Sequence, residues 1–224
     1  MSPGLTQKAH QQLIGYLGLL LPFLIYGLAG IRPTDGLEPW QLLPSVSAYY
    51  HTGAVGMFVG VLFALALFLV TYRGYKDDLA DRRIGKVAGL AAIGVALFPT
   101  TAPDGVMPPT WWSETTTVIH YVSAVGLFIC FIVFAVWLFR KSSIPARADR
   151  PPDKRRRDDI CLACGIVMIL AVLWAASSML TGVDIFWPET VAIIAFAVSW
   201  LVKGEAPKTA MDAMQQLSQK VFAK

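Results

Sequence analysis

The sequence predicts an all-α polytopic membrane protein with six transmembrane helices and both termini in the cytoplasm. The prediction depends on composition, on the length of the apolar blocks and on the distribution of positive charge. Of the 224 residues, 55% are hydrophobic and only 15% are charged, whereas a soluble domain carries about a quarter charged residues. With a mean hydropathy of +0.55, this composition indicates a chain that uses lipid as part of its solvent.

Six apolar blocks have the length that a membrane span requires. Crossing a bilayer core of about 30 Å takes roughly 17–25 helical residues, and the two shorter blocks, the third and the sixth, are flanked by residues that can extend a helix. None of the blocks alternates with a period of two, as a membrane barrel would require, and hydrocarbon otherwise accepts only helices. The predicted spans are residues 13–30, 52–72, 86–101, 116–139, 160–181 and 187–202.

The positive charges predict the orientation of these spans. If the even-numbered connections and both termini share one side, that side holds 18 of the 19 Lys and Arg residues, and only Arg32 lies opposite. Cytoplasmic loops retain Lys and Arg, so this side is predicted to be cytoplasmic and the protein to be a multi-pass protein of the bacterial inner (cell) membrane. The basic pI then reflects topology, and no nucleic-acid partner is expected.

Two parts are expected along the chain. Residues 1–203 form the six-span bundle, and residues 204–224 form a cytoplasmic amphipathic tail on the membrane surface. One alternative concerns the first apolar block, which ends in the small residues Gly27, Ala29 and Gly30. If this block were a cleaved signal peptide, five spans would remain and the amino terminus would lie outside.

Small residues recur at helical spacing in the second and third blocks. Such residues let helix backbones approach closely where packing replaces the hydrophobic effect. They predict close packing between helices and leave open a homo-oligomer formed through small-residue faces. The residues are Gly53, Gly56, Gly60, Gly85, Ala88, Gly89, Ala92 and Ala96.

Three cysteines, Cys130, Cys161 and Cys164, all lie inside predicted spans. No disulfide framework is indicated, because the outer loops, where an oxidising compartment favours disulfides, contain no cysteine. The pair Cys161 and Cys164 forms a CxxC motif at the start of the fifth span. Packing as small apolar side chains is favoured over redox chemistry, because no thioredoxin-like βαβ pattern surrounds the motif.

Polar and aromatic residues collect at the predicted outer end of the bundle. His51 and His120 each lie within about one turn of an outer helix end, and ionisable residues at membrane depth are candidates for function. We expect a shallow polar pocket with an aromatic rim that binds or handles a lipid or another amphiphile at the outer leaflet, without a cofactor. The candidate lining residues are Ser47, Tyr50, His51, Asp104, Trp111, Trp112, His120 and Asp184.

Two other functions stay open at this point. In the first, His51 and His120, joined by Asp104 or Asp184, hold Zn²⁺ with an open position for water, and the metal-bound hydroxide hydrolyses a lipid. In the second, the protein is a small transporter or channel, although the predicted spans contain few charged residues. Whether the protein is an enzyme is therefore undecided by the sequence.

Two family resemblances are carried by the segments around the histidines. Residues 45–51 (SVSAYYH) open a Gly-containing span, residues 94–100 (GVALFPT) close the next span, and His120 opens the fourth. This layout resembles small bacterial six-span proteins of a domain-of-unknown-function family, distantly similar to DRAM/Sfk-type membrane proteins. That resemblance implies a six-helix bundle and a role with lipids, and it brings no catalytic residues.

The second resemblance is to the CREST membrane hydrolases, a family that includes alkaline ceramidases and hemolysin III-like proteins. Their Ser-x3-His motif is similar to Ser47 and His51. The chain lacks the His-x3-His pair that the family carries in its final span, and it has six predicted spans instead of seven. The resemblance would imply a zinc hydrolase, and these departures put the family's three-histidine zinc site in doubt.

Overall fold

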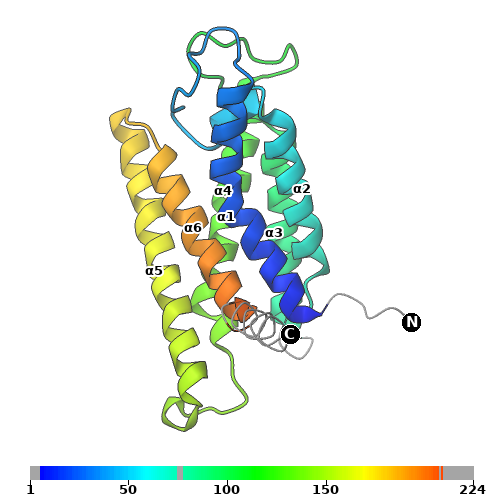
Figure 1. Cartoon of the computed structure of the whole chain (residues 1–224), viewed down its shortest axis with the longest axis vertical. Coiled ribbons are helices and arrows are strands. Elements are labelled where there is room, and N and C mark those ends of the chain that lie inside the picture. Colours follow the sequence, from blue (N-terminus) through cyan, green and yellow to red (C-terminus); the bar gives the residue numbers. More distant parts are fainter. Residues whose placement is uncertain (1–5, 75–77, 207, 209–224) are drawn as a thin grey trace, which may run out of the picture.

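A computed structural model describes residues 6–74, 78–206 and 208 of the chain (Figure 1). Within these ranges the protein is entirely helical and contains no strand, which confirms the predicted all-α class. Most of the predicted tail, residues 209–224, lies outside the described residues. The helices are α1 (Gln7–Ile31), η1 (Ser47–His51), α2 (Val55–Thr71), α3 (Leu79–Leu97), α4 (Glu114–Val136), η3 (Leu138–Arg140), η4 (Arg147–Asp149), α5 (Pro152–Thr181) and α6 (Phe186–Lys203).

Within the described ranges, four helices are long and apolar enough to cross a membrane. They are α1, α4 counted through η3, α5 and α6. Helix α2 is equally apolar but has only 17 residues, and α3 carries charged residues in its first two turns. Long apolar helices of this kind are typical of a membrane protein.

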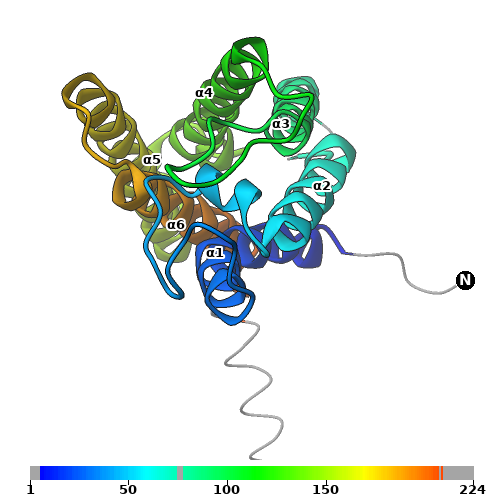
Figure 2. The ribbon, with the colours of Figure 1, turned by 90° about the horizontal axis from the view of Figure 1, so that it is seen from above.

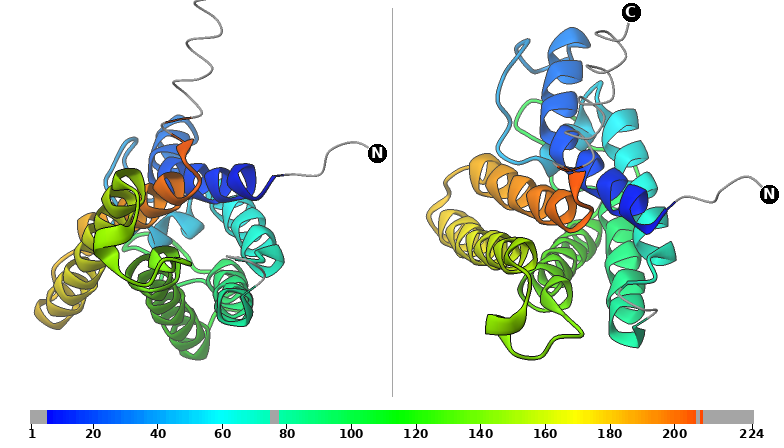
Figure 3. Two further views of the ribbon diagram at one scale, coloured as in Figure 1. Left: turned by 90° about the horizontal axis from the view of Figure 1, so that it is seen from below. Right: turned by 60° about the horizontal axis from the view of Figure 1, so that its bottom comes forward.

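The six long helices of the described residues form a ring in chain order. Each helix contacts the next one, and α6 closes the ring on α1 (Figure 2). Helices α5 and α6 run side by side as a hairpin (Figure 3), and α6 also contacts α4. We call the end of the bundle that carries η1 the η1 end, and the opposite end, with the α4–α5 connection, the η3–η4 end (Figure 1).

Local capping explains where the helices begin and end. Helix α1 begins after Thr6, whose hydroxyl accepts a hydrogen bond from Ala9 N at 3.2 Å, and α5 ends at Gly182, which adopts a left-handed φ of +71°. Helix α3 begins at Leu79, seven residues before the predicted boundary, because the Asp78 carboxylate accepts from Ala80 N at 2.8 Å. Because charged residues occupy the first two turns of α3, runs of apolar residues alone do not reveal where this helix begins.

Glycines set the distance between α2 and α3. A Cβ atom on Gly85 would lie 2.6 Å from the carbonyl oxygen of Leu69, and one on Gly89 would lie 2.8 Å from that of Ala66. The predicted close packing of small residues is confirmed at these positions. Gly56 and Gly60 do not pack against another described helix of the chain: a Cβ on either would meet nothing within 4 Å, because both glycines lie on an exposed face of α2.

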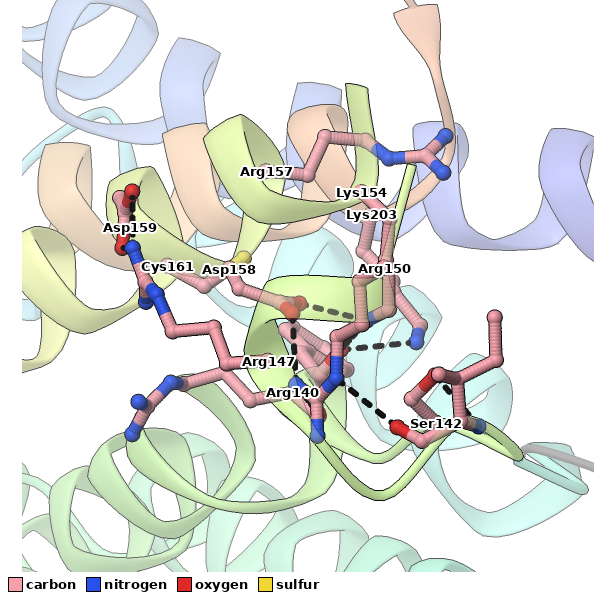
Figure 4. Close-up of polar contacts among 12 residues, drawn as sticks. Arg140, Ser142, Arg147, Arg150, Lys154, Arg157, Asp158, Asp159, Cys161 and Lys203 are labelled. Atoms are coloured by element: carbon pink, nitrogen blue, oxygen red, sulfur yellow. Dashed lines mark hydrogen bonds and ion pairs between the residues drawn. The ribbon is translucent and has the colours of Figure 1, made fainter. Parts of the chain in front are cut away.

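Ion pairs order the α4–α5 connection at the η3–η4 end (Figure 4). The Asp158 carboxylate, only 2% exposed, accepts from Arg150 Nη1 at 3.0 Å and from Lys154 Nζ at 2.5 Å. The carbonyl oxygen of Phe139 accepts from Lys154 Nζ and from Lys203 Nζ, each at 3.1 Å. The segment from residue 140 to 159 is therefore held against α5 and α6, and α5 already begins at Pro152.

Candidate ligand-binding site at the η1 end

Glu189 lies in the first turn of α6, where the bundle meets the α1–α2 connection. Its Oε2 atom accepts a hydrogen bond from Val46 N at 2.7 Å, just before η1 begins. A second bond, from Ile185 N to the carbonyl oxygen of Pro44 at 2.7 Å, fixes the same connection to the start of α6. A carboxylate in the first turn of a helix is also favoured by the helix dipole. These contacts hold Glu189 at a defined position inside the bundle.

Two hollows meet at Glu189. The first, which we call the lateral groove, has a volume of about 130 Å³ between α4, α5 and the start of α6. The second, which we call the central cavity, has a volume of about 60 Å³ and extends among α1, α2, α4 and α6. The groove is lined mainly by apolar side chains, including Ala124, Val125, Phe128, Ala171, Val172, Ala175, Met179 and Ala192, with His120, Tyr121 and Glu189 as its polar members.

The two histidines are buried, and each contacts a backbone carbonyl at the end of α3. His51 Nε2 lies 2.8 Å from the carbonyl oxygen of Thr100, and His120 Nδ1 lies 2.7 Å from that of Phe98. A carbonyl oxygen only accepts, so each of these ring nitrogens donates its proton. Burial lowers the pKa of the His51 imidazole below its ordinary value of 6.5, and the bond to Thr100 offsets part of this shift. His51 is therefore a neutral donor at neutral pH.

The predicted lining residues separate into a buried group and an exposed group. Ser47, His51 and His120 are buried, Ser47 lines the central cavity, and His120 lines the lateral groove. Tyr50 is half-buried, with its ring centroid 5.5 Å from that of His51. The remaining candidates lie in the connections at the η1 end: Asp104, Trp111 and Asp184 are exposed, and Trp112 is half-buried.

The described residues do not form a metal site of the predicted kind. They contain no group of three or more His, Cys, Asp or Glu side chains placed to hold a metal ion. Asp104 is exposed in the α3–α4 connection, whereas His51 and His120 are buried and bonded to backbone carbonyls. His51, His120 and Asp104 are therefore not arranged as the ligands of one zinc ion. The hydrolase stays a hypothesis without support from this geometry.

Glu189 is the site residue that sequence reasoning missed. The pocket that the sequence predicts does not include it. A signal was nevertheless present, because Glu189 lies inside the sixth apolar block, residues 187–202. An ionisable residue within a membrane span is by default a candidate for function.

Another hollow of the described structure lies away from Glu189. It has a volume of about 470 Å³ and lies beside the end of α2, lined by Val70, Thr71, Tyr72, Arg73, Arg82 and Lys86. The three basic side chains are exposed, as expected for charges beside a membrane. We place the candidate site at the lateral groove, because two titratable groups, His120 and Glu189, meet apolar walls there.

Comparison with protein-family models, with curated proteins and with solved structures finds no significant match to this chain. The two resemblances drawn from the residues around His51 and His120 therefore stay hypotheses. The function has to be argued from the geometry of the groove and the residues that line it.

Proposed function

We propose that this chain is an integral membrane protein that binds or handles a lipid or another amphiphile in the lateral groove. The observation that carries the proposal is the groove itself, which has apolar walls on α4 and α5 and polar groups, Glu189 and His120, at one end. An amphiphile has the same division between an apolar chain and a polar head. Ligand sites are commonly apolar hollows with a few polar groups that orient the ligand.

We further propose that all six helices span the bacterial inner membrane, with the η1 end outside and both termini in the cytoplasm. The surface of the shorter helices supports this topology: Leu67 on α2 is 64% exposed and Leu90 on α3 is 66% exposed, as expected for side chains that face lipid. At a rise of 1.5 Å per residue, α2 extends for about 26 Å, close to the bilayer core of about 30 Å. Positive charge supports the orientation, because the loops at the η1 end carry only Arg32.

Cysteine labelling in intact cells tests this topology. Asp104→Cys, in the exposed α3–α4 connection, should react with a membrane-impermeant maleimide from outside the cell. Asp159→Cys, which replaces a half-exposed carboxylate at the η3–η4 end, should react only after lysis. The native cysteines are buried and give a low background. Labelling of Asp159→Cys in intact cells, with protection of Asp104→Cys, would reverse the orientation.

Filling the groove should remove its ligand. Ala175 of α5 lines the groove, and Ala175→Phe would occupy it with an aromatic ring. Ala163→Phe is the matched control, because Ala163 is exposed on the same helix and does not line the groove. Native mass spectrometry of the proteins purified in a mild detergent should show a bound amphiphile on the wild type and on Ala163→Phe, and none on Ala175→Phe. Equal occupancy of all three proteins would place the ligand elsewhere.

A further inference from the structure

The Glu189 carboxylate has hydrogen-bonding capacity that the described residues do not use. A carboxylate offers about four lone-pair positions. Val46 N donates to it at 2.7 Å, and the backbone N–H of Ser47 also interacts with it. Two backbone donors hold the side chain in place and leave acceptor positions for a ligand. Because Glu189 lines both the lateral groove and the central cavity, part of its surface is open to them.

No cation of the described chain neutralises Glu189. The ion pairs among the described residues involve acids at the η3–η4 end, and none includes Glu189. An ionised carboxylate away from water is costly unless it is paired. A cationic group of a ligand would provide the missing partner, and an ammonium–carboxylate contact is a strong, charge-assisted hydrogen bond.

The charges around the groove also favour a positively charged ligand. The η1 end carries six acids, Glu189 among them, against the single base Arg32; the other five are Asp35, Glu38, Asp104, Glu114 and Asp184. His51 and His120 each donate a ring N–H to a backbone carbonyl oxygen. These two donors are therefore not directed at a ligand headgroup. A ligand with a net negative headgroup would meet an unfavourable potential here, whereas a positive one would be attracted.

From these observations we propose that the lateral groove selects amphiphiles whose headgroup presents a protonated amine, and that Glu189 binds this amine. The inference rests on the proposed function. The apolar walls, which include Ala124, Phe128 and Ala171, contact the first part of the alkyl chain. The amine lies at the η1 end, where the Glu189 carboxylate accepts its hydrogen bonds.

Three amphiphiles with the same twelve-carbon tail test the headgroup. Dodecylamine, dodecanol and dodecanoate are titrated at pH 7 against the full-length protein in a mild detergent, and binding is measured by native mass spectrometry. We expect the wild type to bind dodecylamine about 10-fold more tightly than dodecanol, since a charged hydrogen bond replaces a neutral one, and dodecanoate least tightly. Butylamine, which has the same amine and a short chain, should bind at least about 10-fold more weakly than dodecylamine because it buries fewer methylene groups.

Two variants locate the preference. In Glu189→Gln the amide oxygen can still accept from Val46 N, but the negative charge is gone. We expect this variant to bind dodecylamine and dodecanol equally, with dodecanol affinity unchanged. Glu114→Gln is the matched control, because Glu114 is an exposed acid at the same end of the bundle. It should keep the wild-type preference, which separates binding at Glu189 from general attraction to an acidic surface.

The outcomes distinguish this inference from the proposed function. If the wild type binds all three twelve-carbon compounds equally, the amine inference is overturned and amphiphile binding stands. If it binds none of them, the proposed function fails and the inference fails with it. Butylamine binding as tight as that of dodecylamine would indicate a site for free amines. The order of affinities in the wild type decides these points even if Glu189→Gln does not fold, and a preference that survives in a folded Glu189→Gln would exclude Glu189 as its cause.

Discussion

Replacing Asp158 with Ala is expected to lower the free energy of unfolding by about 3–5 kcal/mol, because it removes the carboxylate of a buried ion pair and leaves its basic partners unpaired. Arg150 and Lys154, both more than four-fifths buried, would lose the carboxylate that neutralises them. Arg150 also donates to the carbonyl oxygens of Arg140, Ile144 and Pro145, so the whole α4–α5 connection depends on its position. Denaturant unfolding of the detergent-solubilised protein, followed by circular dichroism, measures the loss.

The neighbouring residue provides the control for this prediction. Asp159 pairs with Arg147 at 2.7 Å, but both side chains are about half exposed. Exposed ion pairs contribute about 0–1 kcal/mol, so Asp159→Ala should have little effect on unfolding. If the two variants lost the same stability, the burial of Asp158 would not be the cause, and the network in Figure 4 would not order the connection.

Gly89→Ala is expected to destabilise the bundle by about 1–3 kcal/mol through overpacking. The added methyl group would lie 2.4 Å from Val70 Cγ2 and 2.8 Å from the carbonyl oxygen of Ala66. The Val70 side chain can turn away, but the backbone carbonyl moves only if α2 and α3 separate. The same unfolding assay measures the effect.

Gly60→Ala tests whether the close approach is the cause. Gly60 lies in the middle of α2, and a Cβ there would meet nothing within 4 Å. Alanine has the higher helix propensity, by about 1 kcal/mol, so this variant should be as stable as the wild type or more stable. Comparable destabilisation by both substitutions would show that glycine is needed in this bundle for a reason other than helix packing.

The long apolar helices could be predicted from the sequence, because a membrane span is recognised by the length and composition of one continuous segment. The predicted blocks 116–139 and 187–202 correspond closely to α4 with η3 and to α6. The starts of α3 and α5 could not be predicted from apolar length, because both helices begin in charged segments. Asp78 caps α3, and Pro152 occupies the first position of α5, and such capping needs no apolar residue.

Part of the candidate site could be predicted in the same way. His51 and His120 were placed in one layer from their distance to the ends of apolar blocks, and both are buried near the end of α3. The loop residues Asp104 and Asp184 were grouped with them only because they follow or precede spans, and both are exposed. Proximity to a helix end gives the height of a residue in the bundle, but it does not give the direction of its side chain.

By itself the sequence determined that this protein is helical and that several of its helices have the length and composition to cross a membrane. Those properties depend on runs of neighbouring residues, which the sequence displays directly. Only the tertiary structure decided that Glu189 accepts a hydrogen bond from Val46, 143 residues away, and that Asp158 is buried between Arg150 and Lys154. The lateral groove likewise depends on how α4, α5 and α6 pack together. Which helices become neighbours is decided by contacts between segments that are far apart in the sequence.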